Sequence, residues 1–178
     1  MTLSIEQLHP YFVARVTGVD LTSAISDDMF AQIEAAFNQY AVLVLPGQPL
    51  TDEQQLDFSR RFGRLETAPN YAGKELRLPN EFTDISNLDH TGQILDPADR
   101  LNQYNLGNQL WHTDSSFKAT RAKCSLLSAR EVPKTGGATQ YADMRAAYDE
   151  LPDERKNKIE GLVLEHSIAH SRRKMGFD

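Results

Sequence analysis

The feature that most constrains this chain is an uninterrupted apolar run, AVLVL at residues 41–45, which Pro46 and Gly47 bring to an end. The run is too short to form a helix of its own. A continuous apolar segment that stops at a turn is typical of a strand buried on both faces of a sheet. We therefore predict a central strand over residues 41–45.

Helices are predicted on both sides of this strand. Ser26 is a capping residue, and the apolar residues that follow it fall on one helical face, which predicts a helix over residues 27–40. Thr51 and Gln54 form a capping-box pattern, which predicts a second helix over residues 52–62. Both assignments rest on capping chemistry as well as on apolar spacing.

The rest of the chain shows shorter β-rich segments separated by turns. Strands are predicted over residues 11–16, 82–88, 123–132 and 138–142, and short helices over about 143–150 and 153–162. The stretch from 66 to 110 is rich in Asn, Asp, Gly and Pro, so we expect it to be mostly functional loop. Cys124, the lone cysteine, lies beside apolar residues and is expected to be a buried strand thiol.

Composition and charge exclude several classes of protein. With 178 residues, 40% of them apolar and 25% charged, the chain has what one globular domain needs, and we expect a single domain over 1–178. A net charge of −6 without a basic stripe argues against a nucleic-acid partner. No apolar run approaches the ~20 residues that span a bilayer, and the first residues lack signal-peptide features, so we expect no membrane partner and a cytoplasmic location.

The segment with the clearest chemistry holds His112 and Asp114, two residues apart. In an extended backbone such side chains point to the same face, so an imidazole nitrogen and a carboxylate oxygen can converge on one ion. Two histidines and one carboxylate on one face of iron(II) leave open the positions that oxygen chemistry requires, and this pair supplies two of the three. The alternative is a surface turn in which Asp114 orients His112.

The residues around this pair add a family resemblance. Bulky Trp111 and Phe117 flank the pair, and a Gly-Gly turn that ends at Thr139 follows. On these residues the sequence resembles the TauD/TfdA family of iron(II)/2-oxoglutarate-dependent dioxygenases, whose members carry a W-H-x-D-x-S/T-F motif and, further along, a T/S-G-G-x-T turn. Both motifs are present, over residues 111–117 and 135–139, and the likeness extends along nearly the whole chain.

The resemblance implies a fold, a chemistry and a set of site residues. The implied fold class is mixed α+β, with a double-stranded β-helix, a jelly-roll-like core, and flanking helices. His112 and Asp114 would bind Fe(II), the Thr139 hydroxyl would hydrogen-bond a carboxylate of 2-oxoglutarate, and Asn108 would face the bound organic acids. With O2 and 2-oxoglutarate as co-substrates, such an enzyme oxidises a small-molecule substrate and releases succinate and CO2.

The substrate class follows from the details of the resemblance. Residues 105–112 and 125–130 are most similar to the branch that includes 2,4-dichlorophenoxyacetate dioxygenase. Ala68 stands where taurine-cleaving members have a His, while the Tyr of that region remains as Tyr71. Loss of the imidazole argues against a sulfonate such as taurine. A small carboxylate, for example an aryloxyacetate, is the expected substrate.

One departure from the family concerns groups that stand far downstream of the threonine turn. There the family places its last iron ligand, a His, and an Arg that pairs with the distal carboxylate of 2-oxoglutarate. His166 and His170 do not match that ligand, and Arg172 is a poor substitute for an Arg that binds a carboxylate bidentately. We therefore expect the N-terminal portion of the family domain, incomplete at the C-terminus, with both groups beyond residue 178.

Two alternatives of different classes remain open at this stage. The chain is a non-catalytic metal- or ligand-binding remnant if the distal His and Arg are absent from the protein. It is an assembly fragment if its open sheet edges pair with another chain, and self-association into a homo-oligomer is left open. Trp111 and Phe117 are expected to pack in the core rather than touch substrate, and Tyr71 is expected to be a loop residue whose ring covers apolar surface. The loop charges Lys74 and Arg77 are given no role.

Overall fold

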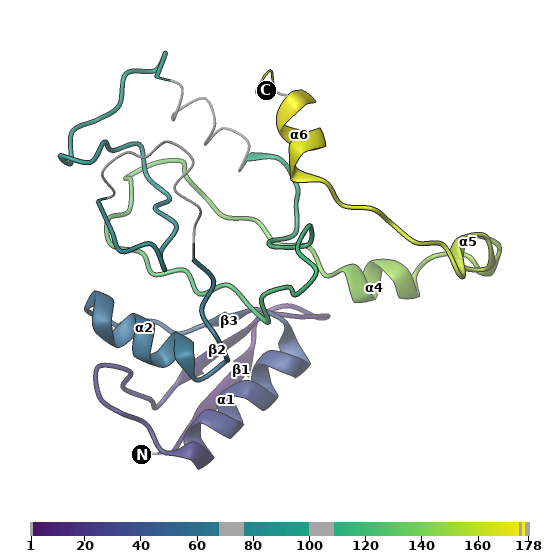
Figure 1. Cartoon of the computed structure of the whole chain (residues 1–178). Helices are drawn as coiled ribbons and strands as arrows, with labels where there is room; N and C mark the ends of the chain where they lie inside the picture. Colours follow the sequence, from purple (N-terminus) through teal and green to yellow (C-terminus); the bar gives the residue numbers. More distant parts are fainter. Residues whose placement is uncertain (1, 68–76, 100–108, 175, 177–178) are drawn as a thin grey trace. The chain divides into compact units, whose positions relative to one another are not determined.

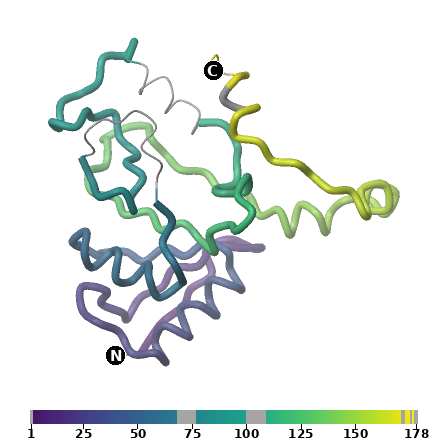
Figure 2. Tube along the Cα trace, viewed as in Figure 1, coloured from purple at the N-terminus to yellow at the C-terminus, as the bar shows by residue number. Residues whose placement is uncertain are grey.

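A computed structural model describes residues 2–67, 77–99, 109–174 and 176. Its helices and strands, in chain order, are β1 (Ser4–Gln7), β2 (Ala14–Thr17), α1 (Asp27–Tyr40), β3 (Leu43–Val44), α2 (Asp52–Arg60), α4 (Met144–Asp149), α5 (Asp153–Ile159) and α6 (Ile168–Lys174), as labelled in Figure 1. The chain forms two compact units, each built from two passages of the backbone that can be followed in Figure 2. The first unit comprises Met1–Arg61 and Leu126–Val163, and the second Phe62–Ser125 and Leu164–Asp178.

The first unit is organised around a small mixed sheet. Its strand order is β1-β2-β3, with β1 antiparallel and β3 parallel to β2. Along β2 the side chains alternate, so that Ala14 and Val16 are fully buried while Arg15 and Thr17 are exposed. This period of two gives the sheet one apolar face, and α1 contacts both β2 and β3.

Helix α1 has the bounds that the sequence predicts. The Ser26 side chain accepts a hydrogen bond from the Met29 N–H, which satisfies one of the free donors of the first turn. Phe30, Ile33 and Ala36 form its buried stripe. The prediction over 27–40 is therefore confirmed, both in its capping residue and in its apolar face.

The strand predicted over 41–45 is shorter and less central than expected. Only β3, Leu43–Val44, forms, and it lies at the edge of the sheet built by the described residues, with Val44 42% exposed. Ala41 has a φ of 62° and its N–H donates to the Phe37 carbonyl, so the first residue of the apolar run is used to close α1. The prediction of a central strand buried on both faces is wrong, and β2 has the middle position.

The first strands also differ from the prediction over 11–16. Val13 has a φ of 65°, which interrupts the extended backbone, and β2 begins only at Ala14. Strand β1, Ser4–Gln7, was not predicted, because all four of its residues are exposed and their sequence lacks an apolar alternation. Its pairing with β2 is made by backbone groups, which side-chain patterns do not reveal.

Helix α2 confirms the second predicted helix and its capping box. The Thr51 side chain accepts from the Gln54 N–H, and the Gln54 side chain accepts from the Thr51 N–H at 2.8 Å. The helix ends at Arg60, before the predicted limit at residue 62.

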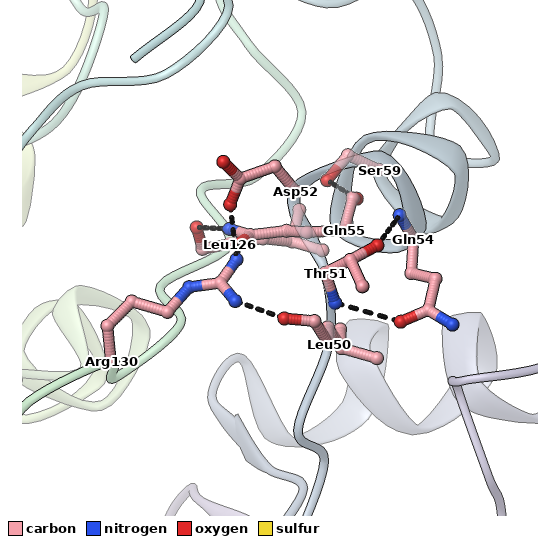
Figure 3. A network of polar contacts seen from close by, with 8 residues as sticks. All are labelled: Leu50, Thr51, Asp52, Gln54, Gln55, Ser59, Leu126 and Arg130. Atoms are coloured by element: carbon pink, nitrogen blue, oxygen red, sulfur yellow. Dashed lines mark hydrogen bonds and ion pairs between the residues drawn. The ribbon is translucent and has the colours of Figure 1, made fainter. Parts of the chain in front are cut away.

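Arg130 links the second passage of the first unit, residues 126–163, to α2, as Figure 3 shows. This passage is called the return segment. The Arg130 guanidinium donates to the Leu50 carbonyl, to Asp52 Oδ1 at 2.9 Å and to Gln55 Oε1 at 2.9 Å. The amide of Gln55 in turn donates to the Leu126 carbonyl at 3.5 Å. The guanidinium thus links the N-terminal turn of α2 to a segment far away in sequence.

A second arginine joins the return segment to α1. The Arg145 guanidinium donates to the carbonyls of Asn38 and Gln39 at 3.1 and 3.3 Å, where the last turn of α1 leaves carbonyl groups free. It also pairs with Asp143, the N-cap of α4. Short helices predicted near 143–150 and 153–162 are confirmed as α4 and α5, and α6 was not predicted.

The strands predicted over 82–88, 123–132 and 138–142 do not form within the described residues. An isolated bridge between Leu88 and Ile94 is the nearest feature. An extended segment becomes a strand only when a neighbouring backbone supplies its hydrogen bonds, and sequence patterns do not name that neighbour. Cys124 is accordingly half-buried in an irregular segment and not in a strand. The structure is mixed α/β, and a jelly-roll is not seen in the part of the chain that it describes.

The described part of the stretch from 66 to 110, in the second unit, is mostly loop, as expected. Between residues 66 and 99 the described backbone contains neither helix nor strand. Side chains organise it instead: Asp89 Oδ1 accepts hydrogen bonds from Thr91 and Gln93, and Arg77 pairs with Asp84 through two contacts of 2.8 Å. Within the described residues, no helix has the length and apolar character needed to cross a membrane.

Candidate functional site

His112 and Asp114 lie together on an exposed turn of the second unit. His112 Nε2 is 3.3 Å from Asp114 Oδ1, and the two side chains are 48% and 57% exposed. His112 Nδ1 lies 2.7 Å from the Leu110 carbonyl oxygen. Because a carbonyl oxygen can only accept, that contact places a hydrogen on Nδ1 and leaves the lone pair of a neutral imidazole on Nε2.

In a neutral imidazole this arrangement sets two hydrogen-bond acceptors, Nε2 and Asp114 Oδ1, against each other, whereas a protonated imidazole makes an ion pair with Asp114. The Nε2 lone pair faces a carboxylate oxygen, and such a contact is favourable only when a proton or a cation lies between them. Two donor atoms that each lie about 2.1 Å from a divalent metal ion are roughly 3 Å apart when they subtend near a right angle. The observed separation of 3.3 Å therefore fits two neighbouring positions on one metal ion.

The second carboxylate oxygen of Asp114 has a partner of its own. Ser125 Oγ donates to Asp114 Oδ2 at 2.6 Å. This is a short hydrogen bond of the kind that a hydroxyl makes to an ionised carboxylate. The two oxygens of Asp114 thus face different groups, His112 on one side and Ser125 on the other.

The turn that follows Asp114 is anchored by Glu66. Ser115 Oγ and Lys118 Nζ both donate to Glu66 Oε2, at 2.7 and 2.8 Å. Burial raises the pKa of the Glu66 carboxyl, but hydrogen bonds from Lys118 and Ser115, the Lys118 charge and the Ala122 N–H outweigh it and leave that pKa below its usual value. Glu66 is therefore held as a carboxylate beside the candidate metal ligands.

A cavity of about 710 Å³ opens beside Asp114 in the same unit. Arg121, Lys123 and His166 contribute to its lining. Cationic side chains next to the carboxylate of a candidate metal ligand give this cavity a charge suited to small organic acids. Among the residues with described positions, no three His, Cys, Asp or Glu side chains are grouped so as to hold a metal ion, and His166 does not join the pair.

The other predicted site residues are placed as follows. Thr139 belongs to the first unit, where it is exposed after the two glycines of its turn. Asn108 lies outside the described residues, as do Ala68, Tyr71 and Lys74. The roles of Thr139 and Asn108 stay predictions.

The exposure of the two aromatic residues of the motif differs from the prediction, whereas Arg77 has no role in the candidate site, as expected. Trp111 is 70% exposed and Phe117 is 42% exposed, so the prediction that they pack in a core is wrong for the structure described here. Arg77, which was given no role, is engaged by Asp84 in a bidentate ion pair.

Sequence reasoning missed Ser125 and Glu66. Ser125 meets Asp114 across a separation of 11 residues, and Glu66 meets Ser115 across 49. The only sequence signal was the likeness of 125–130 to the family, which does not tell a site residue from a structural one.

Comparison with known proteins identifies the family. The family model described as "Taurine catabolism dioxygenase TauD, TfdA family" matches residues 4–177. The chain therefore belongs to the TauD/TfdA family, as the W-H-x-D-x-S/T-F motif indicates.

Its similarity to individual members is high. It is 42% identical over 175 residues to an alpha-ketoglutarate-dependent 2,4-dichlorophenoxyacetate dioxygenase from Burkholderia sp. (strain RASC), covering 97% of this chain and 59% of the relative. It is 39% identical to an (S)-phenoxypropionate/alpha-ketoglutarate-dioxygenase from Sphingobium herbicidovorans, covering 97% and 56%. A crystal structure of AAD-2 in complex with Mn(II) and N-oxalylglycine is similar with a TM-score of 0.88 and 47% identity, covering 99% of this chain and 60% of that one. The chain thus spans about three fifths of the length of these relatives.

Proposed function

We propose that this chain is part of an iron(II)/2-oxoglutarate-dependent dioxygenase that oxidises an aryloxyalkanoate or a similar small carboxylate, with formation of succinate and CO2. The observation that carries the proposal is the contact of 3.3 Å between His112 Nε2 and Asp114 Oδ1, a separation that fits two neighbouring ligand positions on one metal ion. Membership of the TauD/TfdA family supports the choice of iron and 2-oxoglutarate.

The substrate class is supported by three features. Two of the relatives are named for 2,4-dichlorophenoxyacetate and for (S)-phenoxypropionate, and both of these compounds are aryl ethers that carry a carboxylate. In this chain Ala68 replaces the His of taurine-cleaving members. The cavity beside Asp114, with Arg121 and Lys123 in its lining, provides cationic groups for an organic acid.

Each residue of the proposed site has a limited task. His112 contributes the Nε2 lone pair and Asp114 contributes Oδ1. The Thr139 hydroxyl hydrogen-bonds a carboxylate of 2-oxoglutarate, and Asn108 faces the bound organic acids. Bound iron(II) supplies oxygen activation coupled to decarboxylation of the 2-oxo acid. We assign the third ligand and the 2-oxoglutarate-binding Arg to the part of the relatives' length that this chain does not match.

Several properties of the whole protein belong to the same proposal. We infer a double-stranded β-helix core to which residues 1–178 contribute one part of a single domain. We also infer a cytoplasmic enzyme without a nucleic-acid or membrane partner.

An anaerobic titration with iron(II) and 2-oxoglutarate tests the proposal. The chelate of iron(II) with a 2-oxo acid gives a visible charge-transfer band, and we expect that band with the whole protein. His112→Ala should abolish it, because the variant lacks one of the two ligands described here. His170→Ala is the matched control and should keep the band, because His170 is exposed on α6 and has no place in the site.

The other results separate the alternatives. A band from the 178-residue chain itself would mean that another residue or subunit completes the site. Metal binding without a band in the whole protein would favour the non-catalytic remnant. No metal binding in either form would overturn the assignment of His112 and Asp114.

A further inference from the structure

The candidate metal ligand Asp114 lies where packing does little to orient it. Its side chain is 57% exposed, on a turn of the second unit. The last torsion of an Asp side chain is broad and roughly two-fold, so a free carboxylate on such a turn samples many orientations. An ordered carboxylate here requires a specific hydrogen bond.

Ser125 supplies that hydrogen bond. Its Oγ donates to Asp114 Oδ2 at 2.6 Å, while Oδ1 lies 3.3 Å from His112 Nε2. His112 is fixed from its other side by the Leu110 carbonyl, 2.7 Å from Nδ1. A continuous series of contacts therefore runs from Leu110 through both candidate ligands to Ser125.

We propose that Ser125 is a positioning residue that fixes the Asp114 carboxylate so that Oδ1, and not Oδ2, joins His112 in binding a divalent cation. The inference rests on the proposed function, because it assumes that the pair binds a metal ion. It goes further in assigning a task to a hydroxyl that is not itself a ligand.

The hydrogen bond also sets how many coordination positions Asp114 fills. The hydrogen bond from Ser125 occupies one lone pair of Oδ2 and turns Oδ1 toward His112, which favours binding of the ion through Oδ1 alone. A carboxylate that used both oxygens would fill an additional position. Ser125 thereby keeps coordination positions open, which the 2-oxo acid and oxygen require.

The test compares variants of Ser125 in the whole protein, with Mn(II) alone as the probe and its affinity measured by electron paramagnetic resonance. Ser125→Ala removes the donor and should weaken Mn(II) binding by about 10- to 100-fold, the range typical for loss of a group that orients a metal ligand. Ser125→Thr keeps the hydroxyl and should restore most of the affinity. Ser125→Cys, nearly isosteric with a weaker donor, should fall between the two.

A readout that general destabilisation does not move completes the test. The charge-transfer band of iron(II) with 2-oxoglutarate should shift in Ser125→Ala, because the coordination by Asp114 changes. It should stay in place in Ser128→Ala, the same substitution three residues along the segment. Thermal denaturation of each variant shows that the comparison is between folded proteins.

The outcomes separate this inference from the proposed function. Wild-type protein that binds Mn(II), together with Ser125→Ala that binds it equally well and keeps the band position, would overturn the positioning role and leave the metal site standing. Failure of Ser125→Thr to recover affinity would overturn it as well. Wild-type protein that binds no Mn(II) would overturn both.

Discussion

At the scale of single residues, polar contacts rather than apolar packing hold the candidate site. Ser115 has a φ of 55°, a left-handed conformation that residues other than glycine seldom adopt. Its hydroxyl donates to Glu66, which also receives Lys118, so the strained turn after Asp114 is tied to a fixed carboxylate. The orientation of Asp114 therefore depends on groups outside the motif that identifies it.

Glu66 should make the stability of the protein depend on pH. The pKa of its carboxyl is lower in the folded protein than its usual value, so its stabilising contribution is present above that usual value and is lost as the pH falls through the folded-state pKa. Glu66→Gln should therefore lower the free energy of unfolding by about 1 kcal/mol at pH 7, a modest loss because the pair is about one third exposed.

Urea denaturation at several pH values measures this effect. The difference between wild type and Glu66→Gln should shrink below a pH of about 4.3, the ordinary pKa of a glutamic acid. Glu131→Gln, at an exposed position, is the control and should show little difference at any pH. A Glu66→Gln penalty that persists undiminished in acid would mean that the carboxylate charge is not what stabilises the turn.

The sequence could predict the candidate ligands but not the residues that orient them. His112 and Asp114 are found by a spacing of two, which is local and follows from backbone geometry. Ser125 and Glu66 act through contacts that exist only once distant segments meet. The sequence does not show which distant residue a given hydroxyl or carboxylate will contact in the folded protein.

At the scale of elements, helices could be predicted because their signals are local in the sequence, whereas strands depend on distant partners and could not. The start of α1 at Ser26 and that of α2 at Thr51 were predictable because the capping groups lie within the helix's own first turn. Strand β1 was missed, and the segment 123–132 was wrongly predicted as a strand, because pairing depends on a neighbour elsewhere in the chain. The positive φ angles at Val13 and Ala41 further shortened β2 and β3, and neither residue type signals such a conformation.

Arg130 gives a prediction at this scale, because it replaces strand pairing as the tie between α2 and the return segment. Arg130→Lys should lower the free energy of unfolding by about 1 kcal/mol, since a point-like ammonium cannot serve the Leu50 carbonyl, Asp52 and Gln55 together and the site is partly exposed. Chemical denaturation measures it.

The control for this prediction is Arg155→Lys, at an exposed position of α5. This substitution should leave the midpoint of chemical denaturation nearly unchanged. Equal midpoints for wild type and Arg130→Lys would show that the contacts drawn in Figure 3 do not contribute net stability.

At the scale of the whole molecule, apolar burial is unevenly distributed. The buried apolar side chains of the described residues all lie between Phe12 and Leu50, in the first unit. Elsewhere large apolar side chains are exposed, among them Leu162, Val163 and Leu164 at 72%, 95% and 80%. Because the hydrophobic effect follows the area removed from water, the stability of this chain should come mainly from the contact of α1 with the sheet.

Two substitutions test this distribution directly. Ile33 is 1% exposed, and Ile33→Ala should cost about 2–5 kcal/mol, the range for emptying a packed aliphatic site. Val163→Lys places a charge at a position that is 95% exposed and should change the free energy of unfolding by less than about 0.5 kcal/mol. A large loss for Val163→Lys would mean that this side chain is covered in solution. Size-exclusion chromatography of wild type and variant then shows what covers Val163. If a second copy of the chain covers it, the charge should dissociate the two copies; if another part of the same chain covers it, the oligomeric state should not change.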